Sequence, residues 1–448
     1  MSDSFYNYNR ERPPVRGGPI QSTGFGSGWG LRLGMIICLG LLGLYGVLWG
    51  NAVQQSGGPE AYVRQTDFRS ALTAATIISE GRGDHLYDLI TQQDAETEVV
   101  RGFPVSGLRP YTQPPYWGLA LAPLLQLGLP AQTVFTLWTL LSAAAAGLSL
   151  GILAAGWPAR RGPSWLLMLA ATSFFPLITG LMVGQSVGLA LLGLATASTA
   201  FKYQRDLLAG ACLALALVQP TLLPLILLSL IVARRGRALL GFGLAGSAAV
   251  VLPMPVLGAA WPVRYLTFAT DPAHWIIGRG PINEAPQSWR DLLTGAFGAG
   301  GTTTARLVIA LLSAAVLIWL WARPAGQGWA PASPAWDRAW ALTLLLALPN
   351  DPALNVSGLT LALVPGWILA TQAANSPGMS WHTRLWTVLL IAGYATTTPL
   401  VTLFAGVSPY LPLLALTLAA LVLLAERALL GDSLALASGD EEAPSPGP

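Results

Sequence analysis

The chain has 448 residues, of which 53% are hydrophobic and only 10% are charged, and its mean hydropathy is +0.55. Because soluble domains carry about 25% charged residues, this composition excludes an ordinary soluble domain and indicates an integral membrane protein. The formal net charge is only +3, and no basic stripe with interleaved aromatic residues occurs, so nothing indicates nucleic-acid binding. The two cysteines, Cys38 and Cys212, fall in apolar segments, which argues against a disulfide framework or a metal site.

Long apolar stretches predict an all-α polytopic membrane protein. A helix needs about 20 apolar residues to cross a bilayer. Stretches longer than this without a charged side chain lie at 110–159, 162–201, 207–233, 238–263 and 385–425. The longest of them have room for more than one helix, so we expect about twelve crossings in a single transmembrane domain over residues 29–428.

The two ends of the chain predict cytoplasmic tails. Residues 1–28 are rich in Arg, Pro and Gly and have no apolar periodicity, which is typical of disorder, and the same holds for the acidic, Pro-rich tail 429–448. The first apolar run, 31–53, is longer than a signal-peptide core and is expected to be a retained span. The arginines before it place the N-terminus in the cytoplasm. The loop 54–116 is then extracytoplasmic.

Within this first outer loop, apolar residues recur at spacings of three and four over 68–78, which predicts an amphipathic helix on the membrane surface. Gly81 is expected to end it. Leu86 and Tyr87 then look like an anchor into the membrane interface. The apolar segment 114–126 is too short to span comfortably, and we expect it to be re-entrant or interfacial.

The spans that follow alternate so that the arginine-rich short loops lie on the cytoplasmic side. We expect them at 131–155, 164–180, 184–200, 238–257, 304–322, 337–348, 356–371, 385–403 and 410–426. The segment 207–233 is expected to form a hairpin of two short helices, because Pro220 removes a backbone donor in its middle. A second outer loop with a surface helix is expected over 258–303.

Asp67 is the main candidate for chemistry. It lies at the start of the predicted surface helix. The helix dipole stabilises a carboxylate at this place, so Asp67 needs no chemical role to be explained. A helix cap is therefore one interpretation. The other is a general base that takes the proton from an acceptor hydroxyl as this hydroxyl attacks a sugar carbon. Position alone leaves both open.

Further polar residues near the outer ends of the spans are candidates for ligand binding. Gln185 stands between Gly184 and Gly188, which permit a close approach of backbone or ligand. Gln219 precedes the proline break. A polar side chain at membrane depth is a functional hypothesis by default, although helix–helix hydrogen bonding is the simpler explanation. No nucleotide-binding, metal-hydrolase or serine-hydrolase motif occurs in the structural context that such a motif requires.

The order of several motifs is informative beyond any one of them. DFRSALTAATIISEGRGDHLYD (67–88) joins an Asp to a helix, a Gly-rich turn and Leu-Tyr-Asp. It is followed by YTQPPYWG (111–118), by GLMVGQSVG (180–188), by a helix with a polar-Pro break at Gln219, and by INEAPQSWRDLL (282–293). This series resembles glycosyltransferase family 87, a GT-C group of polytopic membrane enzymes.

The resemblance implies a GT-C fold and an inverting transfer from a polyprenyl-phosphate-linked sugar, often mannose, to a lipid or glycan acceptor. It places the reaction on the outer face of a bacterial inner membrane, with Asp67 as the base. No cofactor and no metal are expected, because the leaving phosphate is already charged. The candidates for substrate binding are Arg109, Tyr116, Gln185, Gln219, Arg279, Asn283 and Arg290.

The chain departs from the family pattern in three places. The family usually has Lys before the proline where this chain has Gln219, which removes a cation that could meet the donor phosphate; Arg279 or Arg290 could supply that charge instead. The second-loop segment reads Asn283-Glu284-Ala285. The late outer turn, 349–358, lacks the His found in relatives.

Two alternatives from other functional classes stay open. A flippase or transporter of lipid-linked sugars would predict polar or charged residues inside the spans and some internal repeat symmetry, and neither is evident. A catalytically silent scaffold of a polysaccharide-assembly complex is compatible with the departures at Gln219 and in the late turn.

Overall fold

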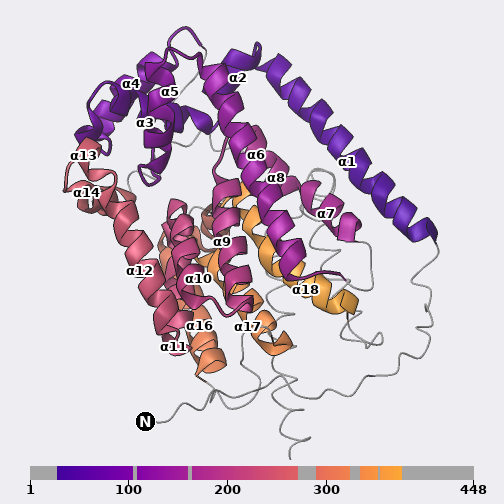
Figure 1. The fold of residues 1–448 in the computed structure, drawn as a ribbon. Coiled ribbons are helices and arrows are strands. Elements are labelled where there is room, and N and C mark those ends of the chain that lie inside the picture. Colours follow the sequence, from indigo (N-terminus) through magenta and orange to yellow (C-terminus); the bar gives the residue numbers. More distant parts are fainter. Residues whose placement is uncertain are drawn as a thin grey trace, which may run out of the picture.

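The computed structural model describes residues 28–103, 108–159, 164–270, 289–322, 333–351 and 354–375. In this part of the chain the secondary structure is helical, without β-strands, as the sequence predicts. Figure 1 shows two parts, a small assembly of short helices, here called the head, and a bundle of longer apolar helices beneath it. The expected spans 385–403 and 410–426 and both tails lie outside the described residues.

The head is formed mainly by the segment that follows the first long helix. Its helices are α2 (Pro59–Gln65), α3 (Phe68–Ser79), the 3-10 helix η1 (Gly83–His85), α4 (Leu89–Val99), α5 (Tyr116–Gln126), α13 (Met254–Leu257) and α14 (Trp261–Thr270). Helix α3 packs against α5 and α4. Apolar side chains of these helices form one buried cluster, which also includes Trp138 from the upper end of the bundle. The core of the head is therefore completed by the upper end of α6 (Ala131–Gly156), which also contributes Val134 and Phe135.

The bundle contains the remaining described helices other than α1, and they run up and down beneath the head. They are α6 (Ala131–Gly156), α7 (Ser164–Thr172), α8 (Phe175–Met182), α9 (Val187–Lys202), α10 (Asp206–Leu213), η2 (Ala214–Val218), η3 (Pro220–Leu222), α11 (Leu223–Val232), α12 (Gly236–Val251), α16 (Trp289–Trp321), α17 (Pro334–Ala347), η4 (Leu348–Asn350), η5 (Ser357–Ala362) and α18 (Leu363–Asn375). Helix α9 packs closely on α6, since a Cβ at Gly188 would lie 2.1 Å from the carbonyl oxygen of Ser142. This contact holds the start of α9 firmly below the head.

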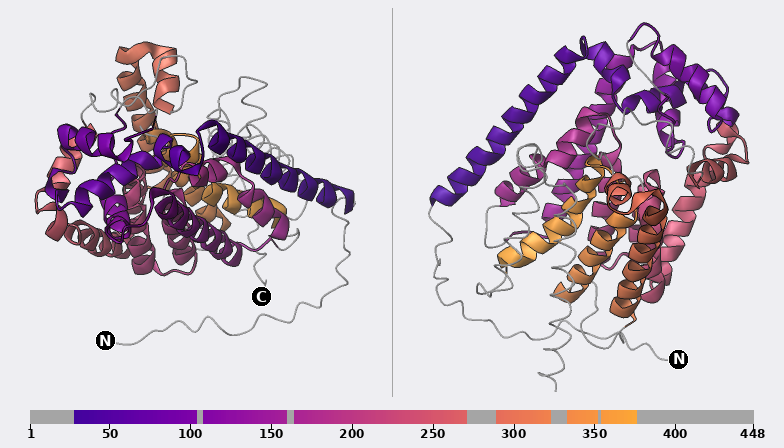
Figure 2. Two further views of the ribbon diagram at one scale, coloured as in Figure 1. Left: turned by 90° about the horizontal axis from the view of Figure 1, so that it is seen from above. Right: turned by 180° about the vertical axis from the view of Figure 1, so that it is seen from behind.

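Helix α1 (Gly28–Gln55) stands beside the bundle in both views of Figure 2 and contacts α2 and α7. Together with α6, α12–α13 and the second part of α16, it is one of four described helices that are long and apolar enough to cross a membrane. The pair α7–α8 makes a fifth if its 44° bend falls within one span. The chain is thus a polytopic membrane protein, and the number of twelve crossings stays a prediction.

The break expected in the segment 207–233 is present. The α-helix ends at Leu213, short 3-10 turns flank Gln219, and α11 begins at Leu223. The two arms return to the same end of the bundle, because Arg235 just after α11 forms an ion pair with Asp206 at the start of α10, with a nitrogen–oxygen distance of 3.3 Å. The sequence prediction of a hairpin is confirmed.

Two expectations for the first outer loop were wrong in detail. Helix α3 forms where the periodicity places it and ends before Gly81, whose φ is +75°. It does not lie on a surface, however, because α4 and α5 enclose it and most of its residues are buried. Leu86 and Tyr87 are likewise buried in the core of the head rather than anchored in an interface. The spacing of apolar residues predicts an amphipathic helix, but it does not tell whether the apolar face packs on a membrane surface or in a protein core.

Candidate active site at the junction of head and bundle

Asp67 lies in the turn between α2 and α3, facing the bundle. Its carboxylate accepts a hydrogen bond at Oδ1 from the guanidinium of Arg109 and one at Oδ2 from Nε2 of Gln185, at 2.9 Å. These partners are 42 and 118 residues away in the sequence. The Asp67 side chain is still 45% exposed, and that of Arg109 is 33% exposed. The structure therefore brings together three of the residues singled out from the sequence and leaves them accessible to a ligand.

The carboxylate of Asp67 does not cap the helix that follows it. Within the described residues it makes no hydrogen bond to the first turn of α3. Only the backbone carbonyl of Asp67 accepts bonds from that turn, from the amide and the hydroxyl of Ser70, at 3.2 Å and 2.9 Å. The capping interpretation is wrong, because the carboxylate accepts hydrogen bonds from Arg109 and Gln185 instead.

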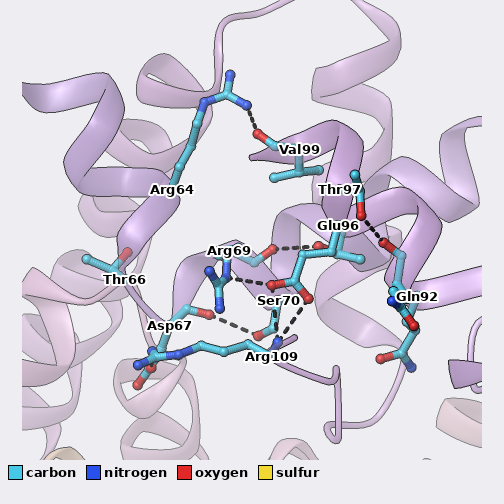
Figure 3. A network of polar contacts seen from close by, with 12 residues as sticks. Arg64, Thr66, Asp67, Arg69, Ser70, Gln92, Glu96, Thr97, Val99 and Arg109 are labelled. Atoms are coloured by element: carbon cyan, nitrogen blue, oxygen red, sulfur yellow. Dashed lines mark hydrogen bonds and ion pairs between the residues drawn. The ribbon is translucent and has the colours of Figure 1, made fainter. Parts of the chain in front are cut away.

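Arg109 is held in place by a buried ion pair (Figure 3). The carboxylate of Glu96 accepts the backbone N–H of Arg109 at 2.9 Å and 3.1 Å, and it pairs with Nε of Arg69 at 2.7 Å. The side chains of Arg69 and Glu96 are only 3% and 4% exposed. Because the backbone of Arg109 is fixed by a buried anion, its guanidinium is directed to Asp67.

Burial acts on both charges of this pair. It raises the pKa of Glu96, against the lowering effects of Arg69 and of the Arg109 amide. It lowers the pKa of Arg69, against the raising effect of Glu96. Each charge is thus poorly solvated and depends on the other, as in buried ion pairs generally.

Gln185 is fixed by the backbone around it. Its own N–H donates to the carbonyl of Gly180 at 2.8 Å, and its carbonyl accepts from the hydroxyl of Ser142 at 3.3 Å. The preceding residue, Gly184, has φ of +72°, and a Cβ there would lie 2.7 Å from Cδ2 of Phe68. The glycine therefore allows the bundle to come close to the residue that follows Asp67, as the sequence suggested.

We expect Gly184→Ala to lower stability by more than about 1–2 kcal/mol, the cost of a left-handed backbone for a residue with a Cβ. The new Cβ would also lie 2.9 Å from Cε2 of Phe135 as well as against Phe68. Thermal unfolding in detergent measures the change. Gly151→Ala on α6 is the matched control, since a Cβ there meets nothing within 4 Å. Equal unfolding temperatures for the two variants would contradict the assignment of a required glycine.

The other predicted substrate-binding residues are less closely placed. Tyr116 begins α5, packs edge-to-face on Trp261 with ring centroids 6.4 Å apart, and has its pKa raised by burial. The hydrogen bonds of the Asp67 carboxylate go to Arg109 and Gln185 and not to Tyr116. Gln219 sits in the break of the hairpin, where its buried Oε1 has no hydrogen-bond partner among the described residues. Arg290 falls in the first turn of α16, and nothing is described of its side chain. Arg279 and Asn283 lie outside the described residues.

The sequence did not single out Glu96 or Ser357, and it offered Arg69 only as one of several outer-loop arginines that could hold a phosphate. Arg69 and Glu96 form the buried pair, and Ser357 donates a hydrogen bond to Oε1 of Gln185. Glu96 and Ser357 stand in polar or turn-like segments, and Arg69 stands in the first turn of an amphipathic helix; charged and hydroxyl side chains at such places are ordinarily solvated. Among the described residues, no group of three or more His, Cys, Asp or Glu side chains is placed to hold a metal ion.

Comparison with known proteins decides the family. The model of glycosyltransferase family 87 matches residues 111–349, which is more than half of the 448 residues. The chain belongs to glycosyltransferase family 87. This glycosyltransferase has no significant match among the curated proteins or among the solved structures compared with it. The family match includes Tyr116, Gln185 and Gln219, but it begins after Asp67 and Arg109, so it gives no information about these two residues.

Proposed function

We propose that this membrane glycosyltransferase moves a hexose, mannose in the first instance, from a polyprenyl-phosphate donor to a hydroxyl of a lipid or glycan acceptor. The observation that supports the proposal is the exposed carboxylate of Asp67, held on both oxygens by Arg109 and Gln185 at the junction of the head with an apolar bundle. A carboxylate supplies a base, and a neighbouring guanidinium supplies a phosphate ligand. An apolar bundle suits a donor whose carrier is a lipid.

In the proposed step, Asp67 takes the proton of the acceptor hydroxyl. The hydroxyl oxygen forms a bond to the anomeric carbon, the bond from that carbon to the phosphate oxygen breaks, and the polyprenyl phosphate leaves with the electron pair. Attack opposite the leaving group inverts the anomeric configuration. The leaving group carries its own charge, so the chain has only to position it and neutralise it.

Arg109 is the residue proposed to meet the donor phosphate. A guanidinium has five N–H donors in a planar fork, and within the described residues only Nη1 is engaged, on Asp67. The other N–H groups are left to grip phosphate oxygens while the contact with the base is kept. One side chain would then set the distance between base and leaving group.

The experiment that tests the donor is transfer of mannose from synthetic polyprenyl-phosphate mannose to membrane-extracted acceptors, by the purified protein in liposomes. We expect transfer from this donor and none from a nucleotide-linked mannose offered without the lipid carrier. Transfer from the nucleotide sugar alone would contradict a lipid-phosphate donor. If the protein used no lipid-linked hexose at all, the role of a silent scaffold would be favoured instead.

We expect Arg109→Gln to raise the KM for the donor about 10- to 100-fold, because hydrogen bonds to a charged group contribute about 1.5–3 kcal/mol. Initial rates at varied donor concentration measure it. Arg101→Gln is the matched control, since Arg101 is an exposed arginine of the same loop. An unchanged KM in Arg109→Gln would remove the phosphate role from Arg109.

The proposal keeps the topology expected from the sequence. Both termini would lie in the cytoplasm, and the head would face the opposite, extracytoplasmic side of a bacterial inner membrane. The positively charged short loops at the far end of the bundle, which include Arg205, Arg234 and Arg235, support this orientation. Accessibility of single cysteines to a membrane-impermeant thiol reagent, placed at Asp94 in the head and at Arg234, would distinguish the two sides.

A further inference from the structure

Ser357 connects the late turn of the chain to the base through one intermediate residue. It is the first residue of η5 and is buried, with 2% of its surface exposed. Its hydroxyl donates to Oε1 of Gln185, which is 172 residues away, and Nε2 of the same carboxamide donates to Oδ2 of Asp67 at 2.9 Å. The three side chains therefore form a chain of hydrogen bonds that ends on the base.

The hydroxyl of Ser357 determines which end of the Gln185 carboxamide faces Asp67. A carboxamide has one accepting end and one donating end. With Oε1 bound to the Ser357 hydroxyl, Nε2 is turned towards the carboxylate. If the group were turned over, two oxygen atoms would face each other at the same distance, and Asp67 would lose a donor.

Ser357 is itself held in place from two sides. Oδ1 of Asn355 lies 2.6 Å from the Ser357 hydroxyl and accepts the backbone N–H of Gly358 at 2.9 Å. The Ser357 hydroxyl is thus shared between two carbonyl oxygens, as in a three-centre hydrogen bond. Across from it, a Cβ at Gly180 would lie 3.3 Å from Cβ of Ser357, so helix α8 packs directly against the residue.

We propose that Ser357 is a positioning residue for the base. It orients Gln185, and Gln185 then fixes Oδ2 of Asp67 while Arg109 fixes Oδ1. With both oxygens fixed, the remaining lone pairs of the carboxylate keep one direction in which to receive the proton of the acceptor. The inference rests on the proposed role of Asp67 and adds to it the group that aims the carboxylate.

The test is a double-mutant cycle of Ser357→Ala and Gln185→Leu, measured as mannose transfer from polyprenyl-phosphate mannose. Because a misplaced catalytic group loses rate even when binding is intact, we expect Ser357→Ala to lower kcat about tenfold with the KM for the donor unchanged. In a variant that already carries Gln185→Leu, adding Ser357→Ala should lower kcat no further. Ser149→Ala is the matched control, since Ser149 is buried and its hydroxyl donates to Ala145 of its own helix.

A second measurement needs no substrate. Labelling of Asp67 by a water-soluble carbodiimide, followed by mass spectrometry, reports how firmly the carboxylate is held, and we expect several-fold faster labelling in Ser357→Ala than in wild type. Ser357→Cys has a slightly larger side chain and a weaker donor. Its labelling rate should fall between those of wild type and Ser357→Ala, and it replaces Ser357→Ala if that variant does not fold. A wild-type labelling rate, or an undiminished loss of kcat in the Gln185→Leu background, overturns the proposal. Wild-type inactivity with every lipid-linked hexose overturns the proposed function instead, and the labelling still decides on Ser357.

Discussion

Asp67→Asn is expected to lower kcat by about 10²- to 10⁴-fold, the range that a general base contributes. The substitution keeps the shape of the side chain, and the remaining carbonyl oxygen can still accept from Arg109, so we expect the KM for the donor to change little. The amide that replaces the other oxygen cannot accept a proton and would face the donating Nε2 of Gln185. Initial rates of mannose transfer, with the unfolding temperature measured in parallel, test the expectation.

Asp94→Asn provides the control for that experiment. Asp94 is an exposed acid on α4 of the same head, and we expect its replacement to leave the rate unchanged. Transfer at the wild-type rate by Asp67→Asn would contradict the assignment of Asp67 as the general base. A variant that loses rate and unfolds at a lower temperature than Asp94→Asn would instead show that Asp67 has a structural role.

Glu96→Gln is expected to lower the free energy of unfolding by about 3–5 kcal/mol, because breaking a buried ion pair leaves the other charge uncompensated. The stranded charge would be that of Arg69, which is 3% exposed. The position of Arg109 would be weakened at the same time, since Glu96 holds its backbone N–H. Thermal and denaturant unfolding in detergent measure the loss.

Two comparisons sharpen this prediction. Glu80→Gln breaks the ion pair of Glu80 with Arg82, whose side chains are 38% and 40% exposed, and solvated pairs of this kind contribute little to stability. In the double variant Arg69→Met, Glu96→Gln no buried charge remains, so most of the lost stability should return. If Glu96→Gln were no more harmful than Glu80→Gln, the buried pair would have no special importance.

The part of the site that could be predicted from the sequence is the part whose signal is local. Asp67 precedes an apolar periodic segment, and Gln185 is a polar residue between two glycines in an apolar stretch. Both signals can be recognised within a few residues of sequence. The hydrogen bond between Asp67 and Gln185, 118 residues apart, could not be predicted, because it depends on Phe68 packing against the backbone of Gly184.

The supporting residues were missed for a physical reason. Glu96 lies in a polar segment without apolar periodicity, where an acid is ordinarily solvated, and Arg69 is one of many arginines in the outer loops. What buries them is the packing of α3 against α4 and α5, which no local pattern encodes. The helices of the bundle could be predicted, because long apolar segments and a proline break are strong local signals. The hairpin at Gln219 is the clearest case.

The residues around the base are divided between the two parts of the molecule. Asp67 and Arg109, with the buried pair behind them, belong to the head, whereas Gln185 and Ser357 belong to the bundle. Neither part alone contains a complete set. Under the proposed function, catalysis therefore needs both parts in contact: a lipid or detergent that shifts Gln185 and Ser357 of the bundle away from Asp67 would lower the rate of transfer without unfolding the protein.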